Sequence, residues 1–331
     1  MAEDKRLIEP IMMEKMAYLL EKVLGKQVDL SFEGDPIEIS EEEIKNYQPK
    51  NNIERAQLIV YAGYEKDTRE QMREAAMNAL KLDNLCCDAY TLLGFAEVDD
   101  ANKALEYFKM GETLFRQRYS DEFFRKNEGE FMNISETRPY MRNLYYTILT
   151  QEMLHLYDDG IETGKQMLKL NKEDSMRIKN RLAMLYIIKD DIENLMPLLE
   201  SIEPENFNEP EILFGASFGS LFYYQDKHAA LKYANTLFEC NEFIGDFFAG
   251  RYIPERDLPG RFPSEEEEKA KEFISMFSKV FNENMKKTRE WMAFLRESSG
   301  AETEKRHTED KQKKKNKRKM AKASRRKNKK K

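Results

Sequence analysis

The feature that most constrains the fold is an internal repeat. Between about residues 51 and 244, apolar residues at helical spacing recur in blocks of about 34 residues, and each block divides into two helices joined by a polar turn. One helix pair cannot bury its apolar face alone, so such a chain must stack its repeats on one another. The sequence therefore predicts an all-α fold.

The blocks carry the signature of the tetratricopeptide repeat. In one first helix the large residue Tyr90 precedes Leu93 and Gly94, and the second helix has Ala104 followed four residues later by Phe108. The small residues stand where the two helices touch. We therefore predict a tetratricopeptide-like right-handed helical solenoid of about five helix pairs, with helical caps and a disordered basic C-terminal tail.

Changes in composition predict the domain boundaries. We expect an N-terminal helical cap over 1–50, repeats over 51–244 with an insertion at 119–140, a connector and C-terminal helix over 245–300, and a disordered basic tail over 301–331. Pro197 falls inside a predicted second helix. Proline removes a helix hydrogen bond, so this helix should start late or kink.

Charge is distributed unevenly along the chain. The 331 residues have a net charge of −6, but residues 311–331 contain 14 Lys or Arg and no Asp or Glu. The first 310 residues therefore contain 41 basic and 61 acidic residues, a charge of −20. A basic run without aromatic residues can bind phosphate but cannot recognise bases. The candidate polyanion-binding residues are Lys313, Lys314, Lys315, Lys317, Arg318, Lys319, Arg325, Arg326 and Lys327. Two other interpretations compete, a solvated tail and a tail folded back on the acidic body.

Cysteine usage and hydropathy favour a cytoplasmic protein. Cys86 and Cys87 are adjacent and Cys240 stands alone, so no disulfide framework or zinc motif is predicted. We expect one of the adjacent cysteines to pack inside and the other to face outward. The longest uncharged apolar run, Ile212 to Tyr224, has 13 residues, fewer than the roughly 20 that span a bilayer. The first residues do not resemble a signal peptide.

Three strings of residues carry a resemblance to a known family. They are Asp121 to Phe131 (DEFFRKNEGEF), Glu136 to Arg142 (ETRPYMR) and Gly245 to Arg251 (GDFFAGR). Over residues 55–297 the chain resembles bacterial relatives of the suppressor-of-tumorigenicity-seven family. The resemblance implies a tetratricopeptide-like fold, a role in protein interaction and no established enzymatic activity. Some of these relatives end in a cysteine-rich zinc motif, which this chain lacks, so no zinc site is carried over.

The sequence contains no recognisable catalytic motif. Its three histidines, His155, His228 and His307, are widely separated, and two of them fall at turns of helix pairs. There is no paired-histidine helix, glycine-rich phosphate loop or Gly-x-Ser-x-Gly elbow. We therefore predict no enzymatic activity, no metal site and no cofactor.

The string from Glu136 to Arg142 supports two interpretations. In the structural one, Pro139 fixes the start of a helix, and Glu136, Arg138 and Arg142 form ion pairs that lock the insertion to the repeats. In the functional one, Arg138, Tyr140 and Arg142 project into the groove and bind a partner's carboxylate or phosphate. We favour the structural interpretation.

In such arrays the first helix of each pair lines a concave surface where partners bind. Counting along the aligned repeats gives these candidate partner-binding residues: Arg142, Tyr145, Leu149, Lys179, Ala183, Tyr186, Phe222 and Tyr223. Such a surface suits a peptide with apolar anchors and an acidic end. Alternatively, several of these residues belong to the core or lie beneath the C-terminal helix. We predict a protein-interaction scaffold. The alternative is a nucleic-acid- or ribosome-associated protein bound nonspecifically through the tail.

Overall fold

The computed structural model describes residues 5–25, 42, 44, 46–97, 99–203, 207–254 and 263–298. Within these ranges the regular structure is helical, apart from one isolated antiparallel bridge between Glu130 and Asn171. The all-α prediction is thus confirmed, whereas the predicted basic tail lies outside the described residues. The chain divides into two compact units, residues 1–182 and 183–331.

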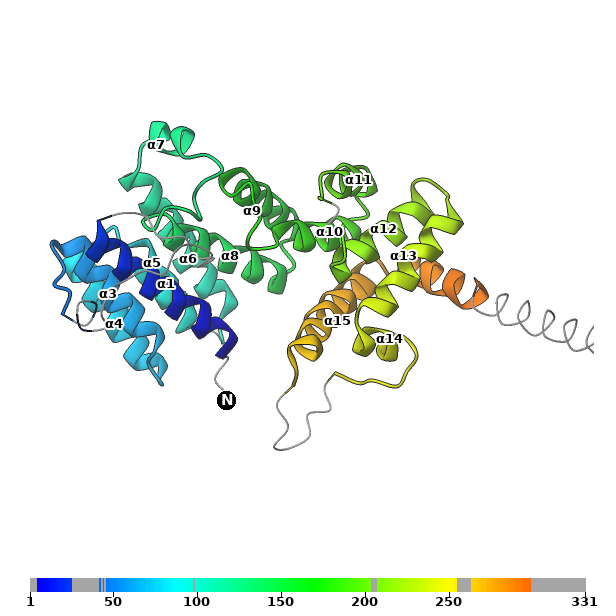
Figure 1. Cartoon of the computed structure of the whole chain (residues 1–331), viewed down its shortest axis with the longest axis horizontal. Helices are drawn as coiled ribbons and strands as arrows, with labels where there is room; N and C mark the ends of the chain where they lie inside the picture. Colours follow the sequence, from blue (N-terminus) through cyan, green and yellow to red (C-terminus); the bar gives the residue numbers. More distant parts are fainter. Residues whose placement is uncertain are drawn as a thin grey trace, which may run out of the picture. The chain divides into compact units, whose positions relative to one another are not determined.

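The first unit contains three antiparallel helix pairs (Figure 1). They are α3 (Asn52–Tyr64) with α4 (Arg69–Leu82), α5 (Cys87–Phe95) with α6 (Ala101–Arg118), and α8 (Arg138–Met153) with α9 (Tyr157–Leu170). This unit also contains α1 (Lys5–Leu24), α7 (Asp121–Lys126) and the first turn of α10 (Ile178–Ile188). A Cβ on Gly94 would lie 2.2 Å from Cε1 of Phe108, so only glycine lets α5 approach α6 this closely. The tetratricopeptide-like pairing predicted from these two residues is confirmed.

Side-chain caps fix where several helices of the first unit begin. Asn51, Thr68 and Asp100 precede α3, α4 and α6, and each accepts a hydrogen bond from the backbone N–H three residues further on. Each such cap stabilises a helix by about 1 kcal/mol. The polar turns between the apolar blocks therefore set the helix boundaries.

The insertion between α6 and α8 packs on the repeats through an aromatic cluster. The ring of Tyr140 stacks on that of Phe115 in α6 at 4.3 Å and meets Phe124 of α7 edge-on at 5.8 Å. Phe131 is fully buried, and its backbone N–H donates to the carbonyl of Leu170 at 3.0 Å. These contacts join the insertion to α6, α8 and α9.

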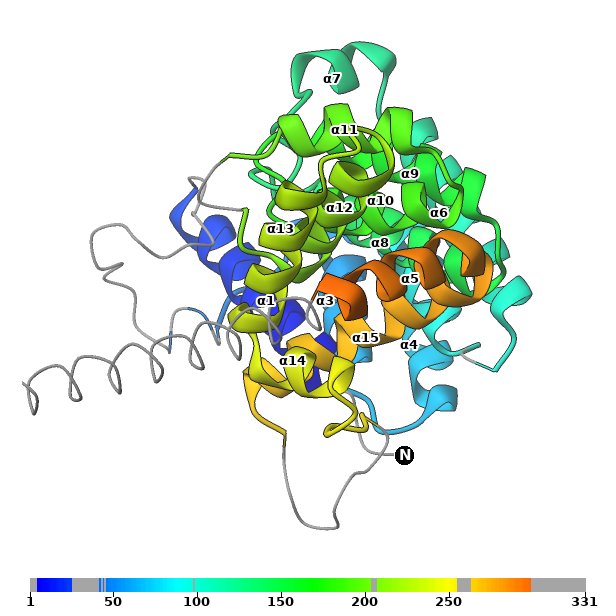
Figure 2. The ribbon, with the colours of Figure 1, turned by 90° about the vertical axis from the view of Figure 1, so that its right-hand side faces the viewer.

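The second unit combines helix pairs with several C-terminal helices. It contains the rest of α10, then α11 (Ile192–Glu200), α12 (Pro210–Phe222), α13 (Lys227–Cys240), α14 (Glu242–Phe248), α15 (Glu265–Glu283) and a helical segment over residues 285–298. α14 lies beside α15 (Figures 1 and 2). Phe214 of α12 contacts Phe277 of α15 at 5.4 Å and Trp291 at 5.0 Å. Among the described helices, none has the length and apolar character needed to cross a membrane.

Pro197 does not delay the start of its helix. α11 begins directly after Asp191, whose carboxylate accepts a hydrogen bond from the backbone N–H of Asn194 at 3.2 Å. The cap lies well ahead of the proline, so the helix is already started where the missing N–H occurs. The late start predicted as one alternative is therefore wrong.

Cys86 and Cys87 are both buried, so the prediction that one of them faces outward is wrong. Cys86 precedes α5 and packs in one apolar cluster with Tyr18 of α1 and Ala89. Burial, and then the nearby Asp88, raise the pKa of Cys86 to about 12 and that of Cys87 well above its usual value. Both thiols are protonated at neutral pH and are therefore poor nucleophiles.

Candidate functional site

One face of α8 is buried in its first half and partly exposed in its second half. Arg138, Arg142, Tyr145 and Leu149 recur at intervals of three or four residues, so they share this face, called the α8 face below. Arg138 and Arg142 are buried, whereas Tyr145 and Leu149 are partly exposed. The difference arises because α1 covers the first half of the face.

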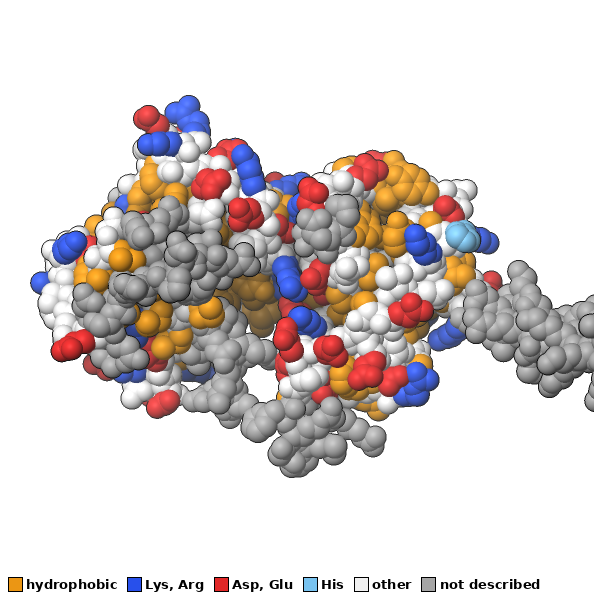
Figure 3. Space-filling view, viewed as in Figure 1, with side chains coloured by type: hydrophobic (Ala, Val, Ile, Leu, Met, Phe, Trp, Pro, Cys, Tyr) orange, Lys and Arg blue, Asp and Glu red, His pale blue; other side chains and the backbone are white. Residues whose placement is uncertain are grey.

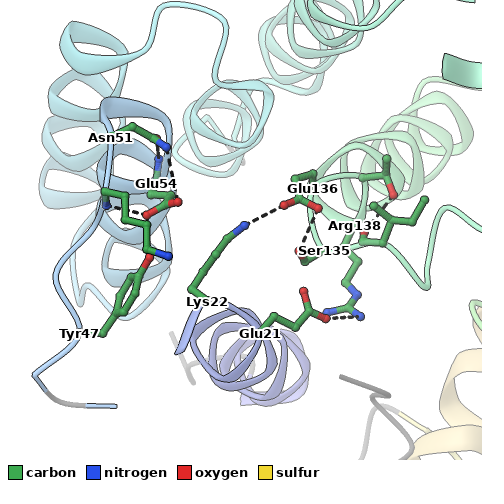
Figure 4. Close-up of polar contacts among 11 residues, drawn as sticks. Glu21, Lys22, Tyr47, Asn51, Glu54, Ser135, Glu136 and Arg138 are labelled. Atoms are coloured by element: carbon green, nitrogen blue, oxygen red, sulfur yellow. Dashed lines mark hydrogen bonds and ion pairs between the residues drawn. The ribbon is translucent and has the colours of Figure 1, made fainter. Parts of the chain in front are cut away.

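Two glutamates of α1 point toward the arginines of α8. Glu14 forms an ion pair with Arg142, and it also accepts a hydrogen bond from the hydroxyl of Tyr61 in α3 at 2.8 Å. Glu21 forms an ion pair with Arg138 at 3.3 Å (Figure 4). The two glutamates are seven residues apart, which places them on one side of α1, and both are buried. α1 thus lies over α3 and α8, the first helices of their pairs.

Exposed ion pairs flank this buried contact. Lys22 of α1 lies 2.7 Å from Glu136, which also accepts a hydrogen bond from Ser135 at 3.1 Å (Figure 4). Lys15 pairs with Glu65 at 2.5 Å. Burial raises the pKa of Glu136, but the bonds from Lys22 and Ser135 outweigh it, so the pKa lies below its usual value. The carboxylate is therefore charged at neutral pH.

Asp88 of α5 organises the charges beneath α1. It is fully buried, and its carboxylate accepts hydrogen bonds from Nε and Nη2 of Arg142 at 3.1 and 2.7 Å. Gln57 and Tyr64 of α3 donate to the same carboxylate at 2.6 and 2.8 Å. Burial and then Asp88 raise the pKa of Tyr64, so its hydroxyl remains a donor. A single polar network therefore connects α1, α3, α5 and α8.

The uncovered half of the α8 face is aromatic. The guanidinium of Arg181 lies over the ring of Tyr145, 5.7 Å from its centroid. Nη1 of Arg181 is also 2.8 Å from each carboxylate oxygen of the buried Glu152. Beside them, Tyr146 contacts Tyr145 at 5.6 Å and Phe95 of α5 at 4.3 Å. Since these three rings are partly exposed, they offer an apolar surface to another molecule.

In the first unit, α1 covers one of the four predicted partner-binding residues and leaves the other three partly exposed. Arg142 binds Glu14 of α1 and Asp88 of α5 and is not accessible. Tyr145, Leu149 and Lys179 are partly exposed. An outside molecule can therefore reach three of the four residues in this structure.

In the second unit, two of the four predicted residues are inaccessible. Ala183 and Tyr186 are buried, so the prediction that they contact a partner is wrong. They lie in the continuous apolar stretch Leu182–Ile188, and a helix that is apolar on all sides is buried. Phe222 is partly exposed, with the ammonium of Lys287 5.7 Å from its ring, and Tyr223 is exposed.

The Glu136 to Arg142 string forms ion pairs, as the structural interpretation predicted. Arg142 pairs with Asp88 of the repeat helix α5, as expected. Glu136, Arg138 and Arg142 also pair with residues of α1, which was not expected. Tyr140 does not project into the groove. It packs in the aromatic cluster of the insertion, so its place in the functional interpretation is wrong.

The acidic half of this site was not predicted from the sequence. Glu14, Glu21 and Asp88 do not stand out there, because acidic residues are abundant in the chain. Two signals were present, namely the seven-residue spacing of the glutamates and a carboxylate inside the apolar helix α5. A buried carboxylate needs a cationic partner, but neither signal identifies that partner.

Other features of the described surface are less distinctive. Within the described ranges, no group of three or more His, Cys, Asp or Glu side chains is arranged to hold a metal ion. Acidic and basic side chains are interspersed over the described surface in Figure 3. The candidate polyanion-binding residues of the tail lie outside the described ranges. The α8 face and its α1 cover therefore form the most specific arrangement of side chains.

Similarity to known proteins is weak. No family model matches the chain, and no curated protein matches it. Among solved structures it is similar to the crystal structure of YrrB, described as a TPR protein with an unusual peptide-binding site. The two are 13% identical, the match covers 58% of this chain and 85% of that chain, and the TM-score is 0.42.

Proposed function

We propose that the chain is a protein-interaction scaffold, rather than an enzyme, and that it binds a segment of a partner on the uncovered half of the α8 face. The observation that carries this proposal is the partly exposed aromatic surface of Tyr145, Tyr146 and Phe95. Tetratricopeptide-like arrays bind partners on the face formed by their first helices. Aromatic side chains in such positions supply a large share of binding free energy.

The surface favours a peptide with apolar anchors and an acidic end. Tyr145 and Leu149 can contact apolar side chains, while Lys179 adds a positive charge. Arg181 already pairs with Glu152, so its role is to hold the ring of Tyr145 in place. The resemblance to relatives of the suppressor-of-tumorigenicity-seven family agrees with a role in protein interaction.

Site-specific cross-linking tests this function. A photoreactive benzoylphenylalanine replaces Tyr145 in the full-length chain, and the matched control carries it at Met110, an exposed residue of α6. We expect one partner protein to cross-link at position 145 and not at position 110, at physiological salt and after nuclease treatment. Tyr145→Ala should then weaken the binding of that partner about tenfold or more.

Two results would contradict the scaffold function. Identical cross-linked products at both positions would mean that the aromatic surface selects nothing. Loss of all products after nuclease treatment, or in a chain truncated to residues 1–300, would instead favour nonspecific binding of nucleic acid or ribosomes through the basic tail.

A further inference from the structure

We propose that the outer face of the first helix pair binds a second copy of this chain. The α3–α4 face is a shallow groove between the two helices, lined by Ile59, Ala62, Lys66, Gln71, Glu74, Ala75 and Asn78. It shares no residue with the α8 face, so this inference goes beyond the proposed function and does not depend on it.

The α3–α4 face is the open end of a stack. Each pair of a repeat array packs on its neighbours, but this first pair has its neighbour α5 on one side only (Figure 1). Tyr61 and Tyr64 of α3 donate hydrogen bonds toward α1 and α5. Ile59 and Ala62 lie on the opposite side of α3, because each residue turns a helix by about 100°. Both are partly exposed, so they leave apolar surface for another molecule.

The two sides of the groove carry opposite charges. Lys66 lies in the turn after α3 and Glu74 lies in α4, and both side chains are exposed. Within the described part of the chain, neither of them forms an ion pair. The adjacent Arg73, by contrast, pairs with Glu97 at 3.1 Å. The groove therefore keeps one positive and one negative group available to a partner.

These charges fit a second copy related by a two-fold axis parallel to the helices. Such an axis places α3 of one copy opposite α4 of the other, so the contact between Lys66 and Glu74 forms twice. An axis across the middle of the helices would instead bring the two Glu74 carboxylates together, which is unfavourable. In the favoured arrangement the four helices form an antiparallel bundle, with Ile59, Ala62 and Ala75 near its axis. The interface is thus apolar at its centre and self-complementary in charge.

Charge reversal in the full-length chain tests this dimer. Sedimentation velocity over a range of protein concentrations gives its dissociation constant. K66E and E74K each place like charges opposite one another twice, so each should raise the dissociation constant at least about tenfold. The charge swap K66E/E74K restores opposite charges and should return the constant to within about threefold of the wild-type value. The matched control is K109E, at an exposed lysine of α6, which should leave the constant unchanged.

Three results would overturn the proposal. A chain that stays monomeric at every concentration would mean that the α3–α4 face is a solvated end of the array. Equal weakening by K66E and K109E would mean that the copies associate elsewhere and respond only to net charge. A swap variant as weak as the single variants would show that Lys66 does not lie opposite Glu74 of the other copy.

Cross-linking of the wild-type chain locates the contact without any substitution. Isotopically light and heavy copies are mixed in equal amounts, and a zero-length carbodiimide joins amines to carboxylates that lie in ion-pair contact. We expect a product in which Lys66 of one isotope is joined to Glu74 of the other. Products of a single isotope would mean that the chain covers its own groove. That result, or a dimeric sample without the mixed product, would overturn the proposal.

Discussion

Both units pack a helix from outside the repeats onto a first helix of the repeats, but the two contacts differ in chemistry. In the first unit, α1 is joined to α8 by the ion pairs of Glu14 and Glu21. In the second unit, the C-terminal helices are joined to α12 by aromatic rings. Phe214 contacts Phe277 and Trp291 there, and the indole N–H of Trp291 donates to Ser217 at 2.8 Å.

The aromatic contact mainly contributes stability, whereas the ion-pair contact mainly contributes selectivity for the helix that docks. Burying aromatic surface contributes a large free energy and depends little on which apolar residues the partner presents. A buried ion-pair network contributes little net stability, because desolvation offsets the attraction, but it strongly penalises a mismatched partner. The C-terminal helices are therefore held by aromatic packing, whereas α1 adds a selective ion-pair network to the apolar packing of Ile11 and Tyr18.

Replacing Trp291 should have the largest effect. Trp291→Ala removes a fully buried ring and leaves the hydroxyl of Ser217 without its donor. We expect the free energy of unfolding of the second unit to fall by about 4 kcal/mol. Amide exchange over residues 263–298, together with urea unfolding followed by circular dichroism, would measure the loss.

The matched control for Trp291→Ala is Met285→Ala, at an exposed position in the same helical segment. It should change the free energy of unfolding by less than about 0.5 kcal/mol. A loss below about 1 kcal/mol for Trp291→Ala would remove the contrast between the two contacts. The C-terminal helices would then be held no more firmly than α1.

Replacing Arg142 should have the next largest effect. Arg142→Met leaves Asp88 and Glu14 buried without the guanidinium between them, which should destabilise the first unit by about 3 kcal/mol. Amide exchange in α1 and α5 would follow this loss.

A surface arginine provides the control for Arg142→Met. Arg73 of α4 also pairs with a carboxylate, that of Glu97 at 3.1 Å, but the Arg73 side chain is 39% exposed. Arg73→Met should change the free energy of unfolding by less than about 1 kcal/mol. Equal effects of the two substitutions would show that the network beneath α1 behaves like an ordinary surface ion pair.

The fold was predictable because its determinants are local. Gly94 and Phe108 belong to one helix pair, and the close approach of its two helices requires glycine at position 94. Polar caps such as Asn51 and Asp100 likewise act within a single turn. Such features recur with the repeat period and can be recognised in the sequence.

The cover of the α8 face was not predictable because its contacts are distant in the chain. Arg142 lies 54 residues from Asp88 and 128 residues from Glu14, and no spacing rule connects them. The sequence suggested that Arg142 would bind a carboxylate, and it does. Which carboxylate it binds is decided by the path of α1, and that path follows from tertiary packing alone.

The exposed pair of Lys22 and Glu136 should give the smallest effect, and it tests whether all polar contacts of α1 are equivalent. The side chain of Glu136 is 46% exposed, so Lys22→Met should weaken α1 docking by less than about 1 kcal/mol. The pKa of Glu136 is lower in the folded chain than in the unfolded chain. The ion pair with Lys22 therefore stabilises α1 docking above the unfolded pKa of about 4.3, and this contribution is lost as the pH falls through the folded pKa. Amide exchange of α1, corrected for the intrinsic effect of pH, should therefore depend less on pH in Lys22→Met than in the wild-type chain. An effect as large as that of Arg142→Met would place the specificity of the site in its exposed ion pairs, and the buried glutamates would then be ordinary packing.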